Sequence, residues 1–186
     1  MDRLVTTTHL EITDRAQLRP PKPASAAMQI VRAEIPSPEL NRFFYAAVGA
    51  RWTWYSRLSW SRARWLAYLD RPEVETWVAY VSGTPAGYFE LERQNEGSVE
   101  IMYFGLLPSF VGKGLGGHLL TAAVERAWDM GATRVWLHTC DLDHPRALAN
   151  YQARGFTVFK VEAAVEHIPD APLEAWPGAD APSAAP

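Results

Sequence analysis

The chain has 186 residues, of which 48% are hydrophobic and 21% are charged, and its formal net charge is -3. This length and composition are typical of one globular domain that buries a sizeable core. A net negative charge argues against the strongly basic surface of proteins that bind nucleic acid or anionic membranes non-specifically. We therefore expect neither nucleic acid nor a membrane among its partners.

Cys140 is the only cysteine, which excludes an intrachain disulfide and a zinc site built from several cysteines. The N-terminal sequence MDRLVTTTHLEITDR has no apolar core of signal-peptide length. No segment approaches the roughly 18 consecutive apolar residues that a membrane-spanning helix requires. We therefore expect a cytoplasmic protein.

Proline and alanine mark both ends of the expected folded part. Residues 1–27 are predicted to contain an N-terminal strand and then an irregular connection rich in Pro and Ala. Residues 28–168 are predicted to form the folded domain. In residues 169–186 prolines and alanines are too dense for regular structure, so we expect a flexible C-terminal tail.

The folded part begins with helical patterns and continues with a meander. Pro38 and Gly49 are typical of the start and end of a helix, and Pro72 ends a second helical pattern. Three strand-like runs follow with breaks too short for parallel crossovers, so antiparallel neighbours are predicted. Along the chain, the predicted elements are a strand over 28–35, helices over 38–49 and 61–70, strands over 74–81, 86–93 and 98–107, a helix over 115–131, a strand over 133–140, a helix over 145–155 and a strand over 156–165. This order predicts a mixed α/β domain.

Four glycines stand just before the third helix, in the segment LLPSFVGKGLGGHLL. Such density lets backbone amides approach a phosphate closely at a helix N-terminus. Gly112, Gly114 and Gly117 spell the G-x-G-x-x-G of dinucleotide-binding proteins, and Asp141 lies near the offset of their acidic residue. A Walker loop is excluded, because no G-K-[ST] follows at the required spacing.

Three observations count against a dinucleotide-binding fold. The residues PSFV separate the preceding strand from the first glycine. The strands before them form an antiparallel meander rather than a βαβ series, and too little chain follows Asp141 to complete a doubly wound sheet. A nicotinamide enzyme therefore stays a weaker alternative.

The segment 100–120 resembles motif A of the GNAT superfamily, the acyl-CoA N-acyltransferases. In that motif a strand and a short Pro-containing loop precede [QR]-x-x-G-x-[GA] and a long helix. Gly114 and Gly116 match the two motif glycines, and Gly112 matches an upstream glycine that many members have. Val111 stands where the family usually has Arg or Gln.

A second segment, HPRALANYQARGF, resembles motif B of the same superfamily. Ala147, Tyr151, Gly155 and Phe156 have the matching spacing, whereas His144 stands where the family usually has Asn. The two motifs together cover about residues 75–160. The resemblance implies the GNAT α/β fold, with a central mixed, mostly antiparallel sheet flanked by helices, over the domain 28–168.

The resemblance also implies a reaction: acetyl-CoA is the acyl donor, no metal is needed, and a small-molecule or peptide primary amine is acetylated by direct transfer. Dimers are common in the family, which makes a homodimer an expectation. The implied cofactor-binding residues are Leu106, Leu107, Val111, Gly112, Lys113, Gly114, Leu115, Gly116, Gly117 and His144. Because Val111 and His144 depart from the motifs, a catalytically silent acyl-CoA-binding module is the alternative.

Two catalytic residues are implied in the same way. Glu100 lies fourteen positions before Gly114, the offset of the general base in the histone-acetylating branch of the superfamily. Tyr151 matches the tyrosine that protonates the thiolate of CoA, and the amide that follows Leu106 would polarise the acetyl carbonyl. A solvent-facing carboxylate and a core tyrosine are the structural alternatives.

Two further groups of residues have chemical potential. His138 and Cys140 share a strand face, but no other His or Cys is placed to complete a metal shell, so we interpret both as mostly structural. Trp52 and Trp54 belong to the aromatic segment RWTWYSRLSWSRARW, where the resembled fold builds its acceptor site. Their rings either pack in the core or line an acceptor pocket that is apolar or cation-binding.

Overall fold

The computed structural model describes residues 1–22 and 27–169. The expected tail over 169–186 therefore lies outside the described residues except for its first residue. The helices and strands are β1 (Asp2–Ile12), β2 (Met28–Arg32), α1 (Pro38–Gly49), α2 (Arg62–Leu69), β3 (Val74–Val81), β4 (Thr84–Arg93), β5 (Ser98–Leu106), α3 (Gly116–Asp129), β6 (Arg134–Cys140), α4 (Ala147–Ala153) and β7 (Thr157–His167).

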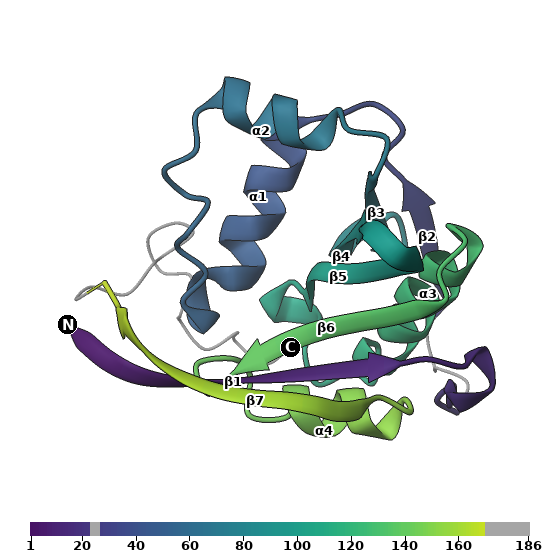
Figure 1. Ribbon diagram of the computed structural model, residues 1–186. Helices are drawn as coiled ribbons and strands as arrows, with labels where there is room; N and C mark the ends of the chain where they lie inside the picture. The colour runs from purple at the N-terminus through teal and green to yellow at the C-terminus, as the bar shows by residue number, and fades with distance from the viewer. Residues whose placement is uncertain (23–26, 170–186) are drawn as a thin grey trace.

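One sheet of seven strands runs through the molecule in the order β2-β3-β4-β5-β6-β1-β7 (Figure 1). All neighbouring strands are antiparallel except β5 and β6, which are parallel. The expected mixed, mostly antiparallel sheet flanked by helices is therefore confirmed. The meander β3-β4-β5 has the antiparallel pairing that its short connections require.

The N-terminal strand β1 is an interior strand. It pairs with β6 on one side, where Thr8 lies opposite Thr139, and with β7 on the other, where Thr8 lies opposite Val161. The sheet thus contains strands from both sides of residue 28, where the sequence predicts that the folded domain begins. That domain boundary stays a prediction. The alternating Leu10 and Ile12 are fully buried, so the end of β1 contributes to the core.

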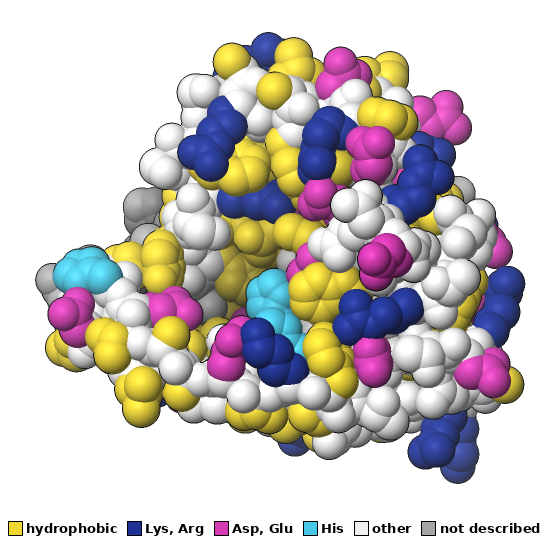
Figure 2. Space-filling view, viewed as in Figure 1, with side chains coloured by type: hydrophobic (Ala, Val, Ile, Leu, Met, Phe, Trp, Pro, Cys, Tyr) yellow, Lys and Arg dark blue, Asp and Glu magenta, His cyan; other side chains and the backbone are white. Residues whose placement is uncertain are grey.

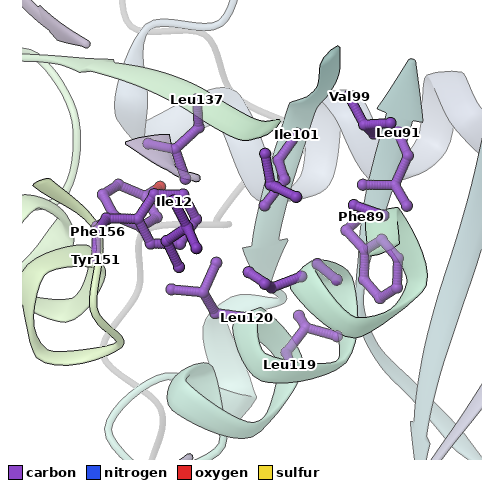
Figure 3. Close-up of a cluster of buried hydrophobic side chains, with 14 of the residues drawn as sticks. Ile12, Phe89, Leu91, Val99, Ile101, Leu119, Leu120, Leu137, Tyr151 and Phe156 are labelled. Atoms are coloured by element: carbon purple, nitrogen blue, oxygen red, sulfur yellow. The ribbon is translucent and has the colours of Figure 1, made fainter. Parts of the chain in front are cut away.

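The main core lies between the sheet and α3 (Figure 3). Leu119, Leu120, Ala123, Val124 and Ala127 repeat at helical spacing and are all fully buried. They pack against alternate residues of β4, β5 and β6 and against α4. Helix α3 is therefore held rigidly on the sheet, with its N-terminus at the end of β5.

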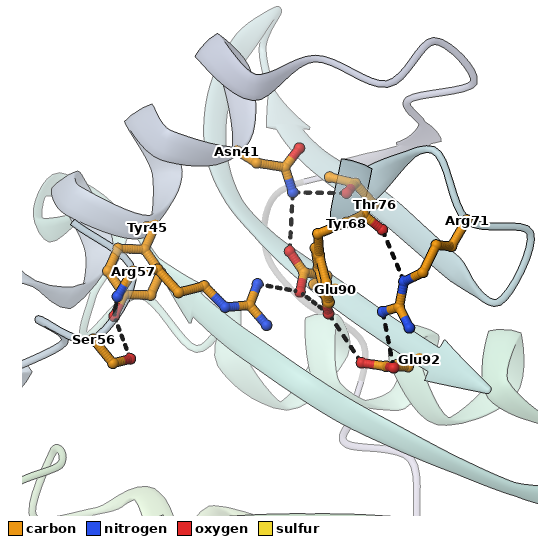
Figure 4. Close-up of polar contacts among 9 residues, drawn as sticks. All are labelled: Asn41, Tyr45, Ser56, Arg57, Tyr68, Arg71, Thr76, Glu90 and Glu92. Atoms are coloured by element: carbon orange, nitrogen blue, oxygen red, sulfur yellow. Dashed lines mark hydrogen bonds and ion pairs between the residues drawn. The ribbon is translucent and has the colours of Figure 1, made fainter. Parts of the chain in front are cut away.

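Helices α1 and α2 pack on the opposite face of the sheet through a buried polar cluster (Figure 4). The Glu90 carboxylate on β4 accepts hydrogen bonds from Arg57 Nη1 at 2.8 Å, from the Tyr68 hydroxyl at 2.7 Å and from Asn41 Nδ2 at 3.0 Å. The guanidinium of Arg57 also lies 4.2 Å from the ring centroid of Tyr68 and 4.5 Å from that of Tyr103. This cluster fixes the loop between α1 and α2.

Candidate functional site

A cleft of about 570 Å³ crosses the molecule between the α1–α2 loop on one side and β5, β6 and the start of α3 on the other. Figure 2 shows a hollow lined mostly by hydrophobic side chains, with histidine and charged side chains at its margin. The cleft has a glycine end at the α3 N-terminus and an aromatic end at the α1–α2 loop. Between these two ends lies the gap where β5 and β6 separate.

The strand gap arises because β5 and β6 pair over only three residues. Ser98 to Glu100 lie beside Arg134 to Trp136, and no later pair is formed between these two strands. Beyond this point residues 101–106 of β5 and Leu137, His138 and Cys140 of β6 line the cleft. A parallel pair that separates in this way leaves backbone amides directed into the opening.

The amides of β5 alternate between β4 and the strand gap. The Leu107 N–H donates to the Ala86 carbonyl at 2.8 Å, so the amide that follows Leu106 is already used within the sheet and cannot polarise a carbonyl as expected. Leu106 lies opposite Gly87 in the next, non-hydrogen-bonded pair of the ladder. Its own N–H therefore points away from β4 and into the gap.

At the glycine end, the loop from β5 to α3 takes a backbone path that requires glycine. Gly112 has a φ of +84° and Gly114 a φ of +75°, a left-handed conformation that side chains disfavour. Helix α3 then begins at Gly116, and its N-cap residue Leu115 has an aliphatic side chain that cannot cap the first amides. These amides are thus suited to bind an anionic group.

Arg154, just after α4, supplies a cation to this end that the sequence motifs did not indicate. It lines the cleft, and its Nη1 lies 2.7 Å from where a Cβ would stand on Gly117. Its Nε is buried and has no hydrogen-bond partner among the described residues. Such an atom is costly to leave unsatisfied, which fits an anionic ligand. Val111, which stands where the family motif usually has Arg or Gln, lines the same cleft, so Arg154 places a positive charge at the end where the motif residue is absent.

Replacing Arg154 with alanine should weaken CoA binding by about 10- to 100-fold, the value of one or two hydrogen bonds to a charged group. Gly117→Ala should act in the same direction, because its methyl group would displace the guanidinium. Arg126→Ala is the matched control, since Arg126 pairs with Asp129 on the surface of α3. Calorimetric titration with CoA measures all three; equal affinities for Arg154→Ala and Arg126→Ala would contradict the assignment.

Glu100 occupies the last position at which β5 pairs with β6 and is buried, with 5% of its surface exposed. It does not line the cleft; its Oε1 lies 3.2 Å from Nδ1 of His138, which does. Gln94 Nε2 donates to the other carboxylate oxygen at 2.6 Å and fixes its orientation. A carboxylate only accepts, so His138 donates from Nδ1 and keeps a lone pair on Nε2.

The hydrogen bond to Glu100 raises the pKa of His138 above its usual value, against the effect of burial, and the Asp143 carboxylate adds to the rise. His138 is therefore a stronger base than an ordinary histidine. Sequence reasoning interpreted it as structural, because it cannot reveal which strand carboxylate lies beside it.

Tyr151 lines the cleft from α4, belongs to the main core cluster and is 8% exposed. Burial, and then the Asp143 carboxylate, raise the pKa of its hydroxyl, so the hydroxyl stays protonated near neutral pH. Its ring centroid lies 6.2 Å from that of Phe104 on β5.

Cys140 also lines the cleft, and burial raises the pKa of its thiol, which disfavours the thiolate that a nucleophilic cysteine needs.

The aromatic end is formed by the α1–α2 loop and the loop between β6 and α4. Trp52 and Trp54 both line the cleft and are half-buried. The Trp52 ring packs edge-on against His144 with centroids 4.9 Å apart. Trp54 packs against Tyr103, and its Nε1 lies 3.4 Å from the Asp143 carboxylate. Trp54 therefore has both a packing role and a place in the cleft wall.

Most of the residues predicted from the sequence meet in this cleft. The predicted residues that line it are Trp52, Trp54, Leu106, Val111, Gly112, Gly114, Gly116, Gly117, His144 and Tyr151. Those that do not line it are Glu100, Leu107, Lys113 and Leu115. Lys113 places its ammonium 5.4 Å from the centroid of the Phe110 ring, and Leu115 is 2% exposed in the core. In the part of the chain that the structure describes, no group of three or more His, Cys, Asp and Glu side chains could hold a metal ion.

Comparisons with known proteins agree with this architecture. An uncharacterized N-acetyltransferase of Mycobacterium tuberculosis is 34% identical over 98 residues, which is 53% of this chain and 62% of the relative. The match thus spans about three fifths of the length of that curated relative.

Solved structures share the fold. A GCN5-related N-acetyltransferase from Kribbella flavida superposes with a TM-score of 0.62 at 19% identity, covering 91% of this chain and 61% of that one. An acetyltransferase from Bacillus subtilis in complex with CoA gives a TM-score of 0.54 at 24% identity, covering 70% and 77%. The Acetyltransferase (GNAT) family matches residues 38–156, well over half of the chain. The sheet, the glycine loop and the cleft described above agree with this match, and the chain belongs to the GNAT acetyltransferase family.

Proposed function

We propose that this protein is an N-acetyltransferase that moves an acetyl group from acetyl-CoA directly to a primary amine. The observation that carries the proposal is the His138–Glu100 pair at the point where β5 and β6 separate, where His138 lines the cleft between its glycine end and its aromatic end. A base at this position lies between the two substrates. The silent-module alternative gives no reason for a buried carboxylate to support a cleft histidine.

Acetyl-CoA is a substrate here and supplies the activated thioester. The amides that begin α3 and the guanidinium of Arg154 would hold its pyrophosphate, as the glycine backbone and the unsatisfied Arg154 Nε support. His144, in place of the usual asparagine, would contact the pantetheine arm. The Leu106 N–H, directed into the gap, would polarise the acetyl carbonyl. The Bacillus subtilis relative solved with CoA supports this donor.

Acetyl transfer requires two proton movements, and the chain has a residue for each. His138 Nε2 would take a proton from the ammonium form of the acceptor, with Glu100 as the positioning residue behind it. As the nitrogen–carbon bond forms and the carbon–sulfur bond breaks, the protonated Tyr151 would give its proton to sulfur. The acceptor nitrogen loses a second proton when it becomes an amide, and this proton restores the Tyr151 hydroxyl.

Incubation of the protein with acetyl-CoA and a panel of primary amines tests the proposal. We expect free thiol and acetylated amine in equal amounts, detected by a thiol reagent and by mass spectrometry. Tight CoA binding without thiol release for any amine would establish the silent module instead. A thermal shift with NADH but none with CoA would revive the nicotinamide alternative.

No helix in the described part of the chain is long and apolar enough to cross a membrane. A cytoplasmic location is part of the proposal, because the donor is acetyl-CoA and the single cysteine suits a reducing compartment. A homodimer stays a prediction, and gel filtration with light scattering measures it.

A further inference from the structure

We infer that the acceptor is a small primary amine carried on a flat aromatic body and lacking a carboxylate of its own. The inference rests on the proposed acetyltransferase function and narrows it from any primary amine to arylalkylamines. It follows from the chemistry of the aromatic end, where ring faces and carboxylates line the cleft together.

The rings supply a flat apolar surface. Trp52, Trp54, Tyr55 and Tyr103 line the cleft, and each is half-buried rather than packed away in the core. They come from the α1–α2 loop and from β5, so they form more than one wall of the same space. Such rings favour an aromatic body by stacking and a nearby cation by the charge distribution of their faces.

Two carboxylates at the aromatic end have hydrogen-bond donors but no ion-pair partner among the described residues, so they can attract the ammonium group of an acceptor. Asp143 and Glu166 line the cleft, and neither forms an ion pair with any residue that the structure describes. Asp143 accepts from Thr139 Oγ1 at 2.6 Å, and Glu166 accepts from the Tyr55 hydroxyl at 3.2 Å. Both carboxylates therefore lie beside the rings, held by hydrogen bonds from neutral donors.

Several cationic side chains lie near the cleft, but among the described residues no ion pair joins any of them to Asp143 or Glu166. Arg154 lines the cleft beside Gly117 at the glycine end, whereas Arg146 belongs to the loop between β6 and α4 and is exposed. Arg3 lies opposite Glu166 in the β1–β7 ladder but is exposed and does not line the cleft. An acceptor carboxylate at the aromatic end would be repelled by the carboxylates of Asp143 and Glu166, which disfavours amino acids as acceptors.

Two other tryptophans of the segment RWTWYSRLSWSRARW, Trp60 and Trp65, pack around the guanidinium of Arg57 and not around the cleft. The Arg57 guanidinium lies 4.7 Å from the ring centroid of Trp60 and 5.7 Å from that of Trp65, and it is paired with Glu90. That aromatic cage is therefore filled by the protein itself. This separates Trp60 and Trp65, which hold Arg57, from Trp52 and Trp54, which face the cleft.

The walls of the aromatic end are tied together, which favours a small acceptor. Three contacts link the α1–α2 loop to the opposite side: the Trp52 ring to His144, Trp54 Nε1 to Asp143, and the Tyr55 hydroxyl to Glu166. A lysine presented by a folded protein surface would need these contacts to open. A free arylalkylamine would not.

Steady-state kinetics with matched acceptors test the inference: tryptamine, tryptophan, which adds a carboxylate to the same ring and amine, and a short lysine-containing peptide. We expect kcat/KM for tryptamine to exceed both others by at least about 10-fold. Equal or better turnover of tryptophan or of the peptide would overturn the inference while leaving the acetyltransferase function intact. Absence of turnover with every amine would instead contradict the proposed function and the inference with it.

Glu166→Gln isolates the charge, because glutamine can still accept from Tyr55. It should raise the tryptamine KM by about 3- to 30-fold, the value of one partly shielded ion pair, and leave the acetyl-CoA KM unchanged. Glu162→Gln is the control, since Glu162 lies on the same strand but pairs with His9 and Lys160 outside the cleft. Trp52→Leu should raise the tryptamine KM to a similar extent. Equal tryptamine KM values for Glu166→Gln and Glu162→Gln would overturn the inference.

Discussion

Replacing His138 with glutamine should lower kcat/KM for acetyl transfer by about 10²- to 10⁴-fold, the usual contribution of a positioned general base. Glutamine can still donate a hydrogen bond to Glu100, so the fold and the affinity for CoA should change little. Initial rates of thiol release with the best amine of the panel measure the effect. His9→Gln is the control, because the His9 ring lies 5.8 Å from that of His138 but does not line the cleft.

Glu100→Gln separates the base from the residue that positions it. The Glu100 hydrogen bond raises the pKa of His138, and only neutral His138 can accept a proton. In the wild type the rate should therefore fall on the acid side at a pH above the ordinary histidine value of about 6.5. In Glu100→Gln this fall should move to lower pH, with a smaller loss of maximal rate than in His138→Gln. Full loss of activity in Glu100→Gln with an active His138→Gln would identify Glu100 itself as the base.

The largest expected loss of stability is that of Glu90→Ala. This change leaves the Arg57 guanidinium, 5% exposed, without its carboxylate partner. Burial acts to lower the pKa of Arg57, but Glu90 and the neighbouring tyrosines outweigh it, so the group stays charged. Removing one partner of such a pair costs about 3–5 kcal/mol of unfolding free energy.

Urea unfolding followed by circular dichroism measures that cost. Glu39→Ala is the matched control, because Glu39 forms an ion pair of similar length, 2.7 Å, with Arg62 on the surface. Its loss should cost less than about 1 kcal/mol, since exposed pairs contribute little. If Glu90→Ala is no less stable than Glu39→Ala, the buried cluster does not hold α1 and α2 on the sheet. Tyr68→Phe, which removes one of three hydrogen bonds to Glu90, should lie between them.

Local signals predicted much of the fold. The helix expected from Pro38 to Gly49 has those bounds, because Ser37 caps it and proline suits its first turn. The strand expected over 74–81 also has its predicted bounds, since its composition and the turn after it are local features. The glycine loop lies where the motif implied, because its left-handed residues must be glycine.

Features that depend on distant contacts could not be predicted. The position of β1 between β6 and β7 brings together the two ends of the chain, and its polar TTTH run does not indicate an interior strand. His138 and Glu100 are 38 positions apart, so their pairing depends on the parallel register of β5 and β6. Arg154 was missed because its unsatisfied Nε becomes evident only when α4 packs beside α3.

A crystal structure with CoA bound tests the central claim most directly. We predict the pyrophosphate on the amides that begin α3 and beside Arg154, and the pantetheine arm in the strand gap between residues 101–106 and 137–140. The sulfur should lie within reach of the Tyr151 hydroxyl, with His138 on the side that faces the aromatic end. A CoA molecule bound outside this cleft, or one whose sulfur points away from His138 and Tyr151, would contradict the account.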